Sequence, residues 1–345
     1  MNTTTYGVDI AKNVFQVHWV DASTGEISRK KLTRAKFAEF FAQRLPARVA
    51  LEACGGAHHW ARTLRAQGHQ AELLPAHQVR AFVSGNKDDA ADARAIWLAA
   101  QHHDLRRVPI KSCEQQAILS LHRMRAHWVS VRTASVNALR GLLYEFGVPL
   151  PKSKAAGFRY LAAHRAAIND QLPAVMVRLL DDQLSALHDI ERHVQAMEDE
   201  LAVLQKTLDA AQRLRQVHGI GLLGATALSA ELGDGSGWRN GREFAACLGL
   251  VPRHTGSGGK VRIGGISKRG QPYLRTLLIS GARSVVTREY PAAWIVQMKA
   301  RRPLNVVVVA VAHKLARTAW AIVAHGRTYD AQWHATHAAA AIRPA

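Results

Sequence analysis

Two acidic residues in the N-terminal part of the chain lie where apolar side chains are expected. Asp9 interrupts the apolar run Gly7-Val-Asp-Ile, and Glu52 ends the run Val49-Ala-Leu-Glu. A buried, unpaired carboxylate is costly, so acids at such positions need a reason. Like charges on neighbouring strands raise a pKa unless a cation neutralises them, and Mg²⁺ binds carboxylate oxygens. These two acids therefore favour a metal site.

Two further acids, Asp89 and Asp92, are three residues apart at the start of an expected helix and therefore share one face. Capping of the helix N-terminus is the simpler interpretation of this pair alone. Taken with Asp9 and Glu52, in the order strand, strand, helix, the four acids predict a site for Mg²⁺ or Mn²⁺. Such a site polarises a phosphodiester and activates an attacking oxygen.

A glycine-rich segment nearer the C-terminus places Ser257 between glycines, so that its backbone can approach a bulky substrate. A serine hydroxyl is a weak nucleophile unless a base or a metal activates it. Read alone, the segment is a flexible phosphate-binding loop, and Thr255 and Ser267 are rivals for any nucleophilic role. Positive charge around it comes from Lys260, Arg262, Lys268 and Arg269.

The run His218-Gly-Ile-Gly221 precedes another expected helix. Amides exposed by Gly219 and Gly221 at a helix N-terminus can hold a phosphate. The run resembles a helix-hairpin-helix element, which grips nucleic-acid backbone without reading sequence. A plain interhelical turn explains the same residues equally well.

The charge balance favours a polyanionic partner. Forty-six Lys and Arg oppose 26 Asp and Glu, a net charge of +20 over 345 residues, and such a field attracts nucleic acid without specifying a fold. A protein that is merely basic is the alternative. Three scattered cysteines form neither a metal motif nor a disulfide framework. No signal peptide or bilayer-spanning run is expected, which favours the cytoplasm, at the nucleoid, with no membrane partner.

The elements that must position the four acids alternate as in an α/β domain. The hydrophobic pattern predicts strands at Thr5–Ile10, Val14–Val20, Glu26–Leu32, Arg48–Leu51 and Ala71–Leu74, and helices at Ala35–Arg44, His58–Gln67 and Ala90–His102. Three regions follow from the whole pattern: an acidic catalytic domain (1–105), a basic helix with a coiled coil (106–215), and a mostly helical, serine-bearing domain (216–345). In the last, helices are expected at Ala225–Leu232, around Phe244–Leu248 and at Asn305–Gly326.

The middle region combines two long helices of opposite charge. The first, Cys113–Phe146, carries Arg125, Arg132 and Arg140 near one side, which indicates a phosphate-tracking face or, equally, a solvated one. The second carries a heptad seam typical of a coiled coil, used for dimerisation or as a spacer, or packed on the preceding helix. The seam is Leu180, Leu184, Leu187, Ile190, Val194, Met197, Leu201, Leu204 and Leu208.

In combination these motifs resemble the insertion-sequence 110 / 1111 transposase family over nearly the whole chain. The matching stretches are Tyr6-Gly-Val-Asp-Ile-Ala-Lys12, Leu51-Glu-Ala-Cys-Gly-Gly56, Lys87-Asp-Asp-Ala-Ala-Asp-Ala93, Val217-His-Gly-Ile-Gly221, Leu248-Gly-Leu-Val-Pro252, Ser257-Gly-Gly-Lys260 and Ile266-Ser-Lys-Arg-Gly-Gln-Pro-Tyr-Leu-Arg275. The third motif of the family reads Lys-Thr-Asp. Here Asp88 replaces the Thr, and the spacing to Asp92 favours Asp89 over Asp88 as the ligand.

The resemblance implies a RuvC-like N-terminal domain of the RNase H class, in which Asp9, Glu52, Asp89 and Asp92 bind Mg²⁺. It implies Ser257 as a nucleophile that forms a covalent phosphoserine link to DNA. The composite site would join acids and serine, from different subunits of a homo-oligomer (a dimer or a tetramer). A structured noncoding guide RNA would choose donor and target DNA.

We therefore expect a DNA transposase, or recombinase, that rejoins the strands it cuts. One alternative is a RuvC-like structure-selective nuclease or Holliday-junction resolvase, which uses metal-activated water and needs no serine. The other is an architectural nucleic-acid-binding protein whose acids are structural.

Overall fold

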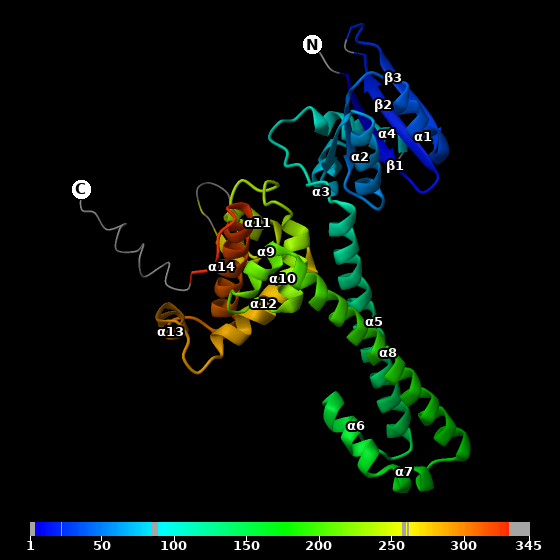
Figure 1. Cartoon of the computed structure of the whole chain (residues 1–345), viewed down its shortest axis with the longest axis vertical. Helices are drawn as coiled ribbons and strands as arrows, with labels where there is room; N and C mark the ends of the chain where they lie inside the picture. Colours follow the sequence, from blue (N-terminus) through cyan, green and yellow to red (C-terminus); the bar gives the residue numbers. More distant parts are fainter. Residues whose placement is uncertain (1–3, 22, 84–88, 257–259, 261, 331–345) are drawn as a thin grey trace, which may run out of the picture. The chain divides into compact units, whose positions relative to one another are not determined.

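A computed structural model of the chain describes residues 4–21, 23–83, 89–256, 260 and 262–330 (Figure 1). The chain divides into two compact units, Met1–Gln115 and Gln116–Ala345. The second unit contains both the long helices of the middle region and the C-terminal helices. The two units are described separately.

The first unit is built on a mixed five-stranded sheet in the order β3-β2-β1-β4-β5. Strands β1, β2 and β3 form an antiparallel meander, whereas β4 and β5 run parallel to β1. Its elements are β1 (Thr5–Ile10), β2 (Val14–Val20), β3 (Ile27–Thr33), α1 (Arg34–Ala42), β4 (Arg48–Glu52), α2 (Ala57–Ala66), β5 (Gln70–Leu74), α3 (Ala76–Val79), the 3₁₀ turn Arg80–Phe82 and α4 (Asp89–Ala100). The strands and helices predicted from the sequence agree with these bounds to within two residues.

Helices cover both faces of this sheet. One face of β1 and β4 carries Val8, Val49 and Leu51, which pack with side chains of α1 and α2. The other face carries Ala50, which packs with side chains of α4. Because successive side chains of a strand point to opposite faces, the residues two positions beyond Gly7 and Ala50, which are Asp9 and Glu52, lie on the face covered by α4.

Helix α4 lies directly on the backbone of β1 at Gly7. A Cβ atom on Gly7 would lie 2.5 Å from both the Ala93 carbonyl oxygen and the Trp97 backbone nitrogen. Both atoms belong to the backbone and cannot move aside as a side chain would. A glycine at this position is therefore required for the helix to approach the strand so closely.

We expect Gly7→Ala to destabilise the protein by about 1–3 kcal/mol, because the added methyl group overpacks the contact with α4. Urea unfolding of the purified variant measures the effect. Gly55→Ala is the matched control, since a Cβ at Gly55 would meet no atom within 4 Å. Equal stability of the two variants would contradict the packing argument.

The second unit contains two long helices followed by a helical bundle. Its elements are α5 (Cys113–Glu145), α6 (Lys154–Ala163), α7 (Arg165–Gln171), α8 (Ala174–Thr207), α9 (Asp209–Arg215), α10 (Leu222–Leu232), α11 (Gly241–Cys247), β6 (Pro252–Thr255), β7 (Arg262–Ile266), α12 (Pro272–Val286), α13 (Ala293–Lys299) and α14 (Leu304–Ala324). The predicted helices of this region all form.

Helices α5 and α8 pack antiparallel along their length (Figure 1). Near one end Leu119 lies in a cluster with Leu201, and near the other Leu143 lies in a cluster with Leu187. The buried part of the heptad seam thus packs against the preceding helix of the same chain, which was one of its two interpretations. Its use between subunits stays a prediction.

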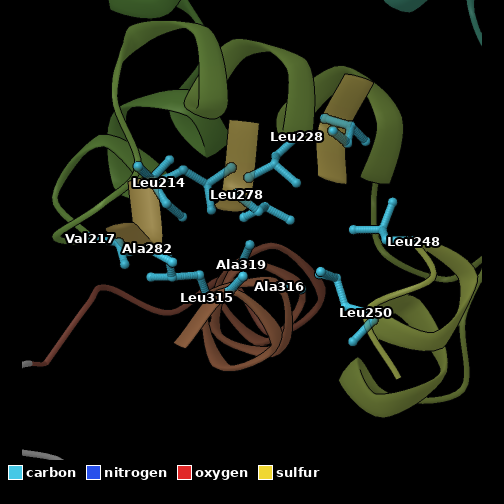
Figure 2. Packing of buried hydrophobic residues seen from close by; sticks show 14 of the residues in the cluster. Leu214, Val217, Leu228, Leu248, Leu250, Leu278, Ala282, Leu315, Ala316 and Ala319 are labelled. Atoms are coloured by element: carbon cyan, nitrogen blue, oxygen red, sulfur yellow. The ribbon is translucent and has the colours of Figure 1, made fainter. Parts of the chain in front are cut away.

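Helix α14 forms the centre of the C-terminal bundle. It is long and apolar enough to span a membrane, with a mean hydropathy of 1.6, but one side of it, which includes Val307, Val311 and Ala319, is buried in the bundle core. Leu315, Ala316 and Ala319 point toward Leu278 and Ala282 of α12 (Figure 2). Packing inside the unit therefore explains the apolar composition of this helix.

The sequence predicts a loop around Ser257 and no strands beside it, whereas the structure has a strand on either side of that segment. Strands β6 and β7 pair antiparallel, with His254 opposite Ile263 and Thr255 opposite Arg262. All residues of β6 are exposed. The strand therefore lacks the alternation of apolar and polar residues from which a half-buried strand is predicted. Ser257 lies between these strands in the chain, outside the described residues.

Candidate active site

The ends of two neighbouring parallel strands bring Asp9 and Glu52 together. In the register of β1 and β4, Val8 lies opposite Leu51, and these residues directly precede the two acids. Parallel strands that end side by side form the edge at which α/β sheets bind ligands. Asp9 also pairs with Gln16 across β2. Both acids are partly exposed at this edge.

Helix α4 adds Asp92 to the same place. Asp89 is the first residue of α4 and Asp92 lies in its first turn. Asp92 immediately precedes Ala93, whose carbonyl contacts Gly7. The side chain of Asp89 lies outside the described part of the structure, as does the whole of Asp88, so the choice between them stays a prediction.

The electrostatics of Glu52 reflect this crowding. Burial and the nearby Asp92 carboxylate both raise the pKa of Glu52 above its usual value, burial being the larger cause. Each effect disfavours the charged form. A bound cation would instead favour the charged form of Glu52. Glu52 and Asp92 therefore form a region that favours positive charge.

Cys54, two residues beyond Glu52, lies in the same field. Burial raises the pKa of its thiol, and Glu52 and Asp9 raise it further. This places Asp9, Glu52 and Cys54 within electrostatic reach of one another. Within the described residues, no group of three His, Cys, Asp or Glu side chains is arranged closely enough to hold a metal ion.

In the second unit, paired glycine contacts close the base of the β6–β7 hairpin. A Cβ on Gly270 would lie 1.7 Å from the Cys247 carbonyl oxygen, and one on Gly249 would lie 2.4 Å from that of Arg269. Both glycines have positive φ angles, +73° and +71°, a conformation that favours glycine. The segment that carries Ser257 therefore starts and ends at a tightly packed base.

The basic residues predicted around Ser257 are exposed. Ser267, a rival nucleophile, is half-buried and donates its backbone N–H to the Val251 carbonyl, whereas Thr255 is exposed at the end of β6. The exposed basic residues are Lys260, Arg262, Lys268 and Arg269. Such a charged surface can contact phosphates.

Comparison with known proteins decides the family. A model described as "Transposase IS116/IS110/IS902 family" matches residues 211–295, and a DEDD model of the IS110 type, described as "Transposase", matches residues 6–147. A probable family 20 transposase of Pseudomonas aeruginosa is 44% identical over 95% of this chain and 99% of its own. The chain belongs to this transposase family.

Two other relatives match the chain over most of its length. The transposase for insertion sequence element IS1328 of Yersinia enterocolitica is 36% identical over 95% of this chain and 99% of its own. The transposase for insertion sequence element IS1111A of Coxiella burnetii is 35% identical over 94% of this chain and 90% of its own. The family predicted from the sequence is confirmed, and with it an enzyme that cuts and rejoins DNA, which argues against a purely architectural role.

The N-terminal DEDD domain of the transposase is of the RuvC-like superfamily, in agreement with its mixed sheet. Domains of this kind typically use a divalent metal.

The three arginines of α5 have protein partners in the transposase. Arg125 forms an ion pair with Glu198 at 2.6 Å, and Arg132 one with Glu191 at 3.1 Å, both across to α8. Arg140 donates to the carbonyls of Pro151 and Lys152. Their role in binding phosphate stays a prediction, because these acceptors compete with phosphate for the guanidinium groups.

The turn at Gly219 and Gly221 packs tightly against α12. A Cβ on Gly281 would lie 1.8 Å from the Gly219 carbonyl oxygen. Gly221 is the N-cap of α10. A cavity of about 570 Å³ lies beside the turn, with Arg215 and Arg288 among its lining residues. Its use in nucleic-acid binding stays a prediction.

A buried histidine that sequence reasoning missed joins α5, α10 and α12. His122 Nδ1 lies 2.9 Å from the Tyr273 hydroxyl, and Nε2 lies 3.0 Å from Thr226 Oγ1. Thr226 donates its hydroxyl to the Leu222 carbonyl, so it accepts from Nε2–H, and Tyr273 donates to Nδ1. No sequence signal identifies His122, since its partners are 104 and 151 residues away.

Replacing Asp92 tests the electrostatic link to Glu52. We expect Asp92→Asn to lower the pKa of Glu52, leaving the elevation that burial causes, because one like charge is removed. NMR titration of the transposase with ¹³C-labelled glutamate measures this pKa. Asp104→Asn, which removes an exposed carboxylate, is the control. An unchanged Glu52 pKa in Asp92→Asn would show that the Asp92 carboxylate does not act on Glu52.

His122 should make the stability of the transposase depend on pH. Burial, and to a lesser degree Arg125, lower its pKa from 6.5 to about 4. Above pH 6.5 His122 is neutral in both states, and its contribution to the stability of the folded state is complete. As the pH falls from 6.5 to about 4 the unfolded state binds the proton first, so the free energy of unfolding decreases by about 3 kcal/mol. Urea unfolding of wild type and His122→Gln across this range isolates the effect. The same pH dependence of stability in both proteins would rule out a contribution from His122.

Proposed function

We propose that the transposase cuts and rejoins DNA with two groups of residues, the carboxylates of its first unit and Ser257. The observation that carries this proposal is the meeting of Asp9 and Glu52 at the ends of parallel strands, with Asp92 raising the pKa of Glu52. Acids at adjacent strand ends repel one another, and a bound cation would neutralise that repulsion. Membership of a DNA-cutting family supports phosphodiester chemistry there.

The proposed cation is Mg²⁺ or Mn²⁺, held by Asp9, Glu52 and Asp92 together with Asp89. The donor set supports this choice, because carboxylate oxygens are the ligands that hard divalent cations prefer. When bound, such an ion neutralises charge that develops on a phosphate. The role of the chain is to hold these oxygens on a rigid sheet and helix before DNA arrives.

The proposed nucleophile is the Ser257 hydroxyl. Its oxygen attacks a DNA phosphorus, the P–O bond of the backbone breaks, the serine proton is lost to a base, and the leaving oxygen takes up a proton. One phosphodiester replaces another, so the reverse attack by a DNA hydroxyl rejoins strands without ATP. The exposed cations Lys260 and Arg262 follow Ser257 closely in the sequence, which supports binding of a phosphate at this segment.

A structured noncoding RNA and a homo-oligomer complete the proposal. The net charge of +20 supports a nucleic-acid surface larger than one duplex requires. Sequencing the RNA that co-purifies with the protein, and matching it to the DNA flanking the element, tests the guide. Light scattering with and without that RNA tests for a dimer or a tetramer.

The second candidate function is a structure-selective nuclease or Holliday-junction resolvase using metal-activated water. The carboxylates alone would suffice for hydrolysis, so this candidate predicts cutting without Ser257.

Two substitutions separate the proposals. We expect Asp9→Asn to reduce DNA cutting about 100-fold or more, because charge stabilisation is lost. We expect Ser257→Ala to abolish both strand exchange and a covalent protein–DNA adduct that survives denaturation, assayed on gels with Mg²⁺ and co-purified RNA. Thr255→Ala and Ser267→Ala are the matched controls. Recombination by Ser257→Ala would overturn the serine assignment, and hydrolytic cutting by it would favour the nuclease.

A further inference from the structure

A cavity of about 1300 Å³ opens on the side of the C-terminal bundle, lined by α11, α13, α14 and the segments that flank α13 and α14. It shares no residue with the carboxylate site or with the β6–β7 hairpin. Helix α14 contributes to both the core and the cavity. Ala316 and Ala319 point into the core (Figure 2), whereas Lys314 and Arg317 line the cavity.

Aromatic rings form much of the cavity wall. Trp294, Trp320, Tyr290 and Tyr329 all line it. Trp320 is fixed, because its indole N–H donates to the Gly235 carbonyl at 3.1 Å. Tyr290 is 86% exposed. Trp294, Trp320 and Tyr329 are partly buried against the bundle core. The exposed faces of these rings and of Tyr290 are available for stacking, and every nucleobase has a face that can stack on them.

Cations outnumber acids beside these rings. Among the described residues that line the cavity are Arg242, Arg288, Lys314, Arg317 and Arg327, against one carboxylate, Asp330. Burial and Arg317 lower the pKa of Lys314, and burial, Arg317 and Arg242 lower that of His313. Lys314 rests 4.7 Å from the centre of the Trp294 ring. Neighbouring positive charges disfavour the protonated forms of one another, and a bound anion would stabilise these forms.

These two features together decide the class of ligand. An apolar protein segment would cover the rings but bury the excess of cations without anionic partners, which is costly. A duplex keeps its bases stacked inside, so it offers no free base face to these rings. Unpaired nucleotides satisfy both features, because bases stack on the rings and phosphates meet the cations.

We propose that this cavity binds a short single-stranded stretch of DNA, with a base stacked at Trp294 and Tyr290 and a phosphate at Arg242 and Arg317. DNA is favoured over RNA because an enzyme that cuts and rejoins DNA generates unpaired DNA strands. The proposal depends on the family activity alone and not on the assignments of Ser257 or of a metal.

Binding of labelled oligothymidine of about 12 nucleotides to the full-length protein, followed by fluorescence anisotropy, tests the cavity. We expect Trp294→Ala to weaken binding roughly 5- to 100-fold through the loss of stacking. We expect Arg317→Gln to weaken binding and to reduce the slope of log affinity against log salt by about 1. Duplex DNA of the same length should respond at most twofold to Trp294→Ala.

Matched controls lie far from the cavity in the same unit. Tyr144→Ala removes an aromatic ring that is 68% exposed on α5, and Arg192→Gln removes a cation on α8 whose side chain is 70% exposed. Neither should change binding more than twofold. Tyr290→Ala provides a second test at an exposed ring whose removal does not disturb the core, and Trp294→Phe, which keeps a stacking face, should restore most of the affinity.

Three outcomes would overturn the proposal. The first is unchanged affinity for oligothymidine in Trp294→Ala and Tyr290→Ala. The second is a loss confined to oligouridine, which would assign the cavity to RNA. The third is a dimer of the wild type that Trp294→Ala dissociates while oligothymidine binding persists, which would make the cavity a subunit interface. Loss of Ser257-dependent recombination alone would leave these binding results unaffected, so the two proposals fail separately.

Discussion

The contact between the Gly7 backbone and helix α4 sets the geometry of the first unit. With no Cβ in the way, the helix approaches until its backbone at Ala93 and Trp97 lies against the strand. Asp92 immediately precedes Ala93, so this approach brings its carboxylate close enough to raise the pKa of Glu52. The candidate metal site thus depends on a missing side chain as much as on the acids themselves.

In the second unit, glycines also allow close backbone contacts, at the base of the hairpin whose connecting segment carries Ser257. Gly249 and Gly270 allow the two ends of the β6–β7 hairpin to lie against backbone atoms of α11 and of the chain after β7. Tyr273, just beyond the hairpin in α12, is hydrogen-bonded to His122 of α5. A neutral, buried imidazole with a partner on each nitrogen fixes this junction, because leaving either nitrogen unpaired would be costly.

Local patterns predicted most of the elements but not their partners. The short apolar runs of β1 and β4 and the helical patterns of α5, α8 and α14 depend only on neighbouring residues, so they could be read directly. The hairpin could not, since its residues are exposed and rich in glycine. The ion pairs of Arg125 and Arg132 depend on the antiparallel register of α5 and α8, which no local spacing encodes.

The amino-acid sequence by itself determined the family, the acidic residues at strand ends, and the excess of positive charge, because these properties belong to residue types and their local order. Only the tertiary structure decided that Asp92 acts on Glu52, that α5 arginines face α8 acids, and that α14 lines an aromatic and cationic cavity. Each of these depends on which distant segments pack together, and packing is a property of the whole folded unit.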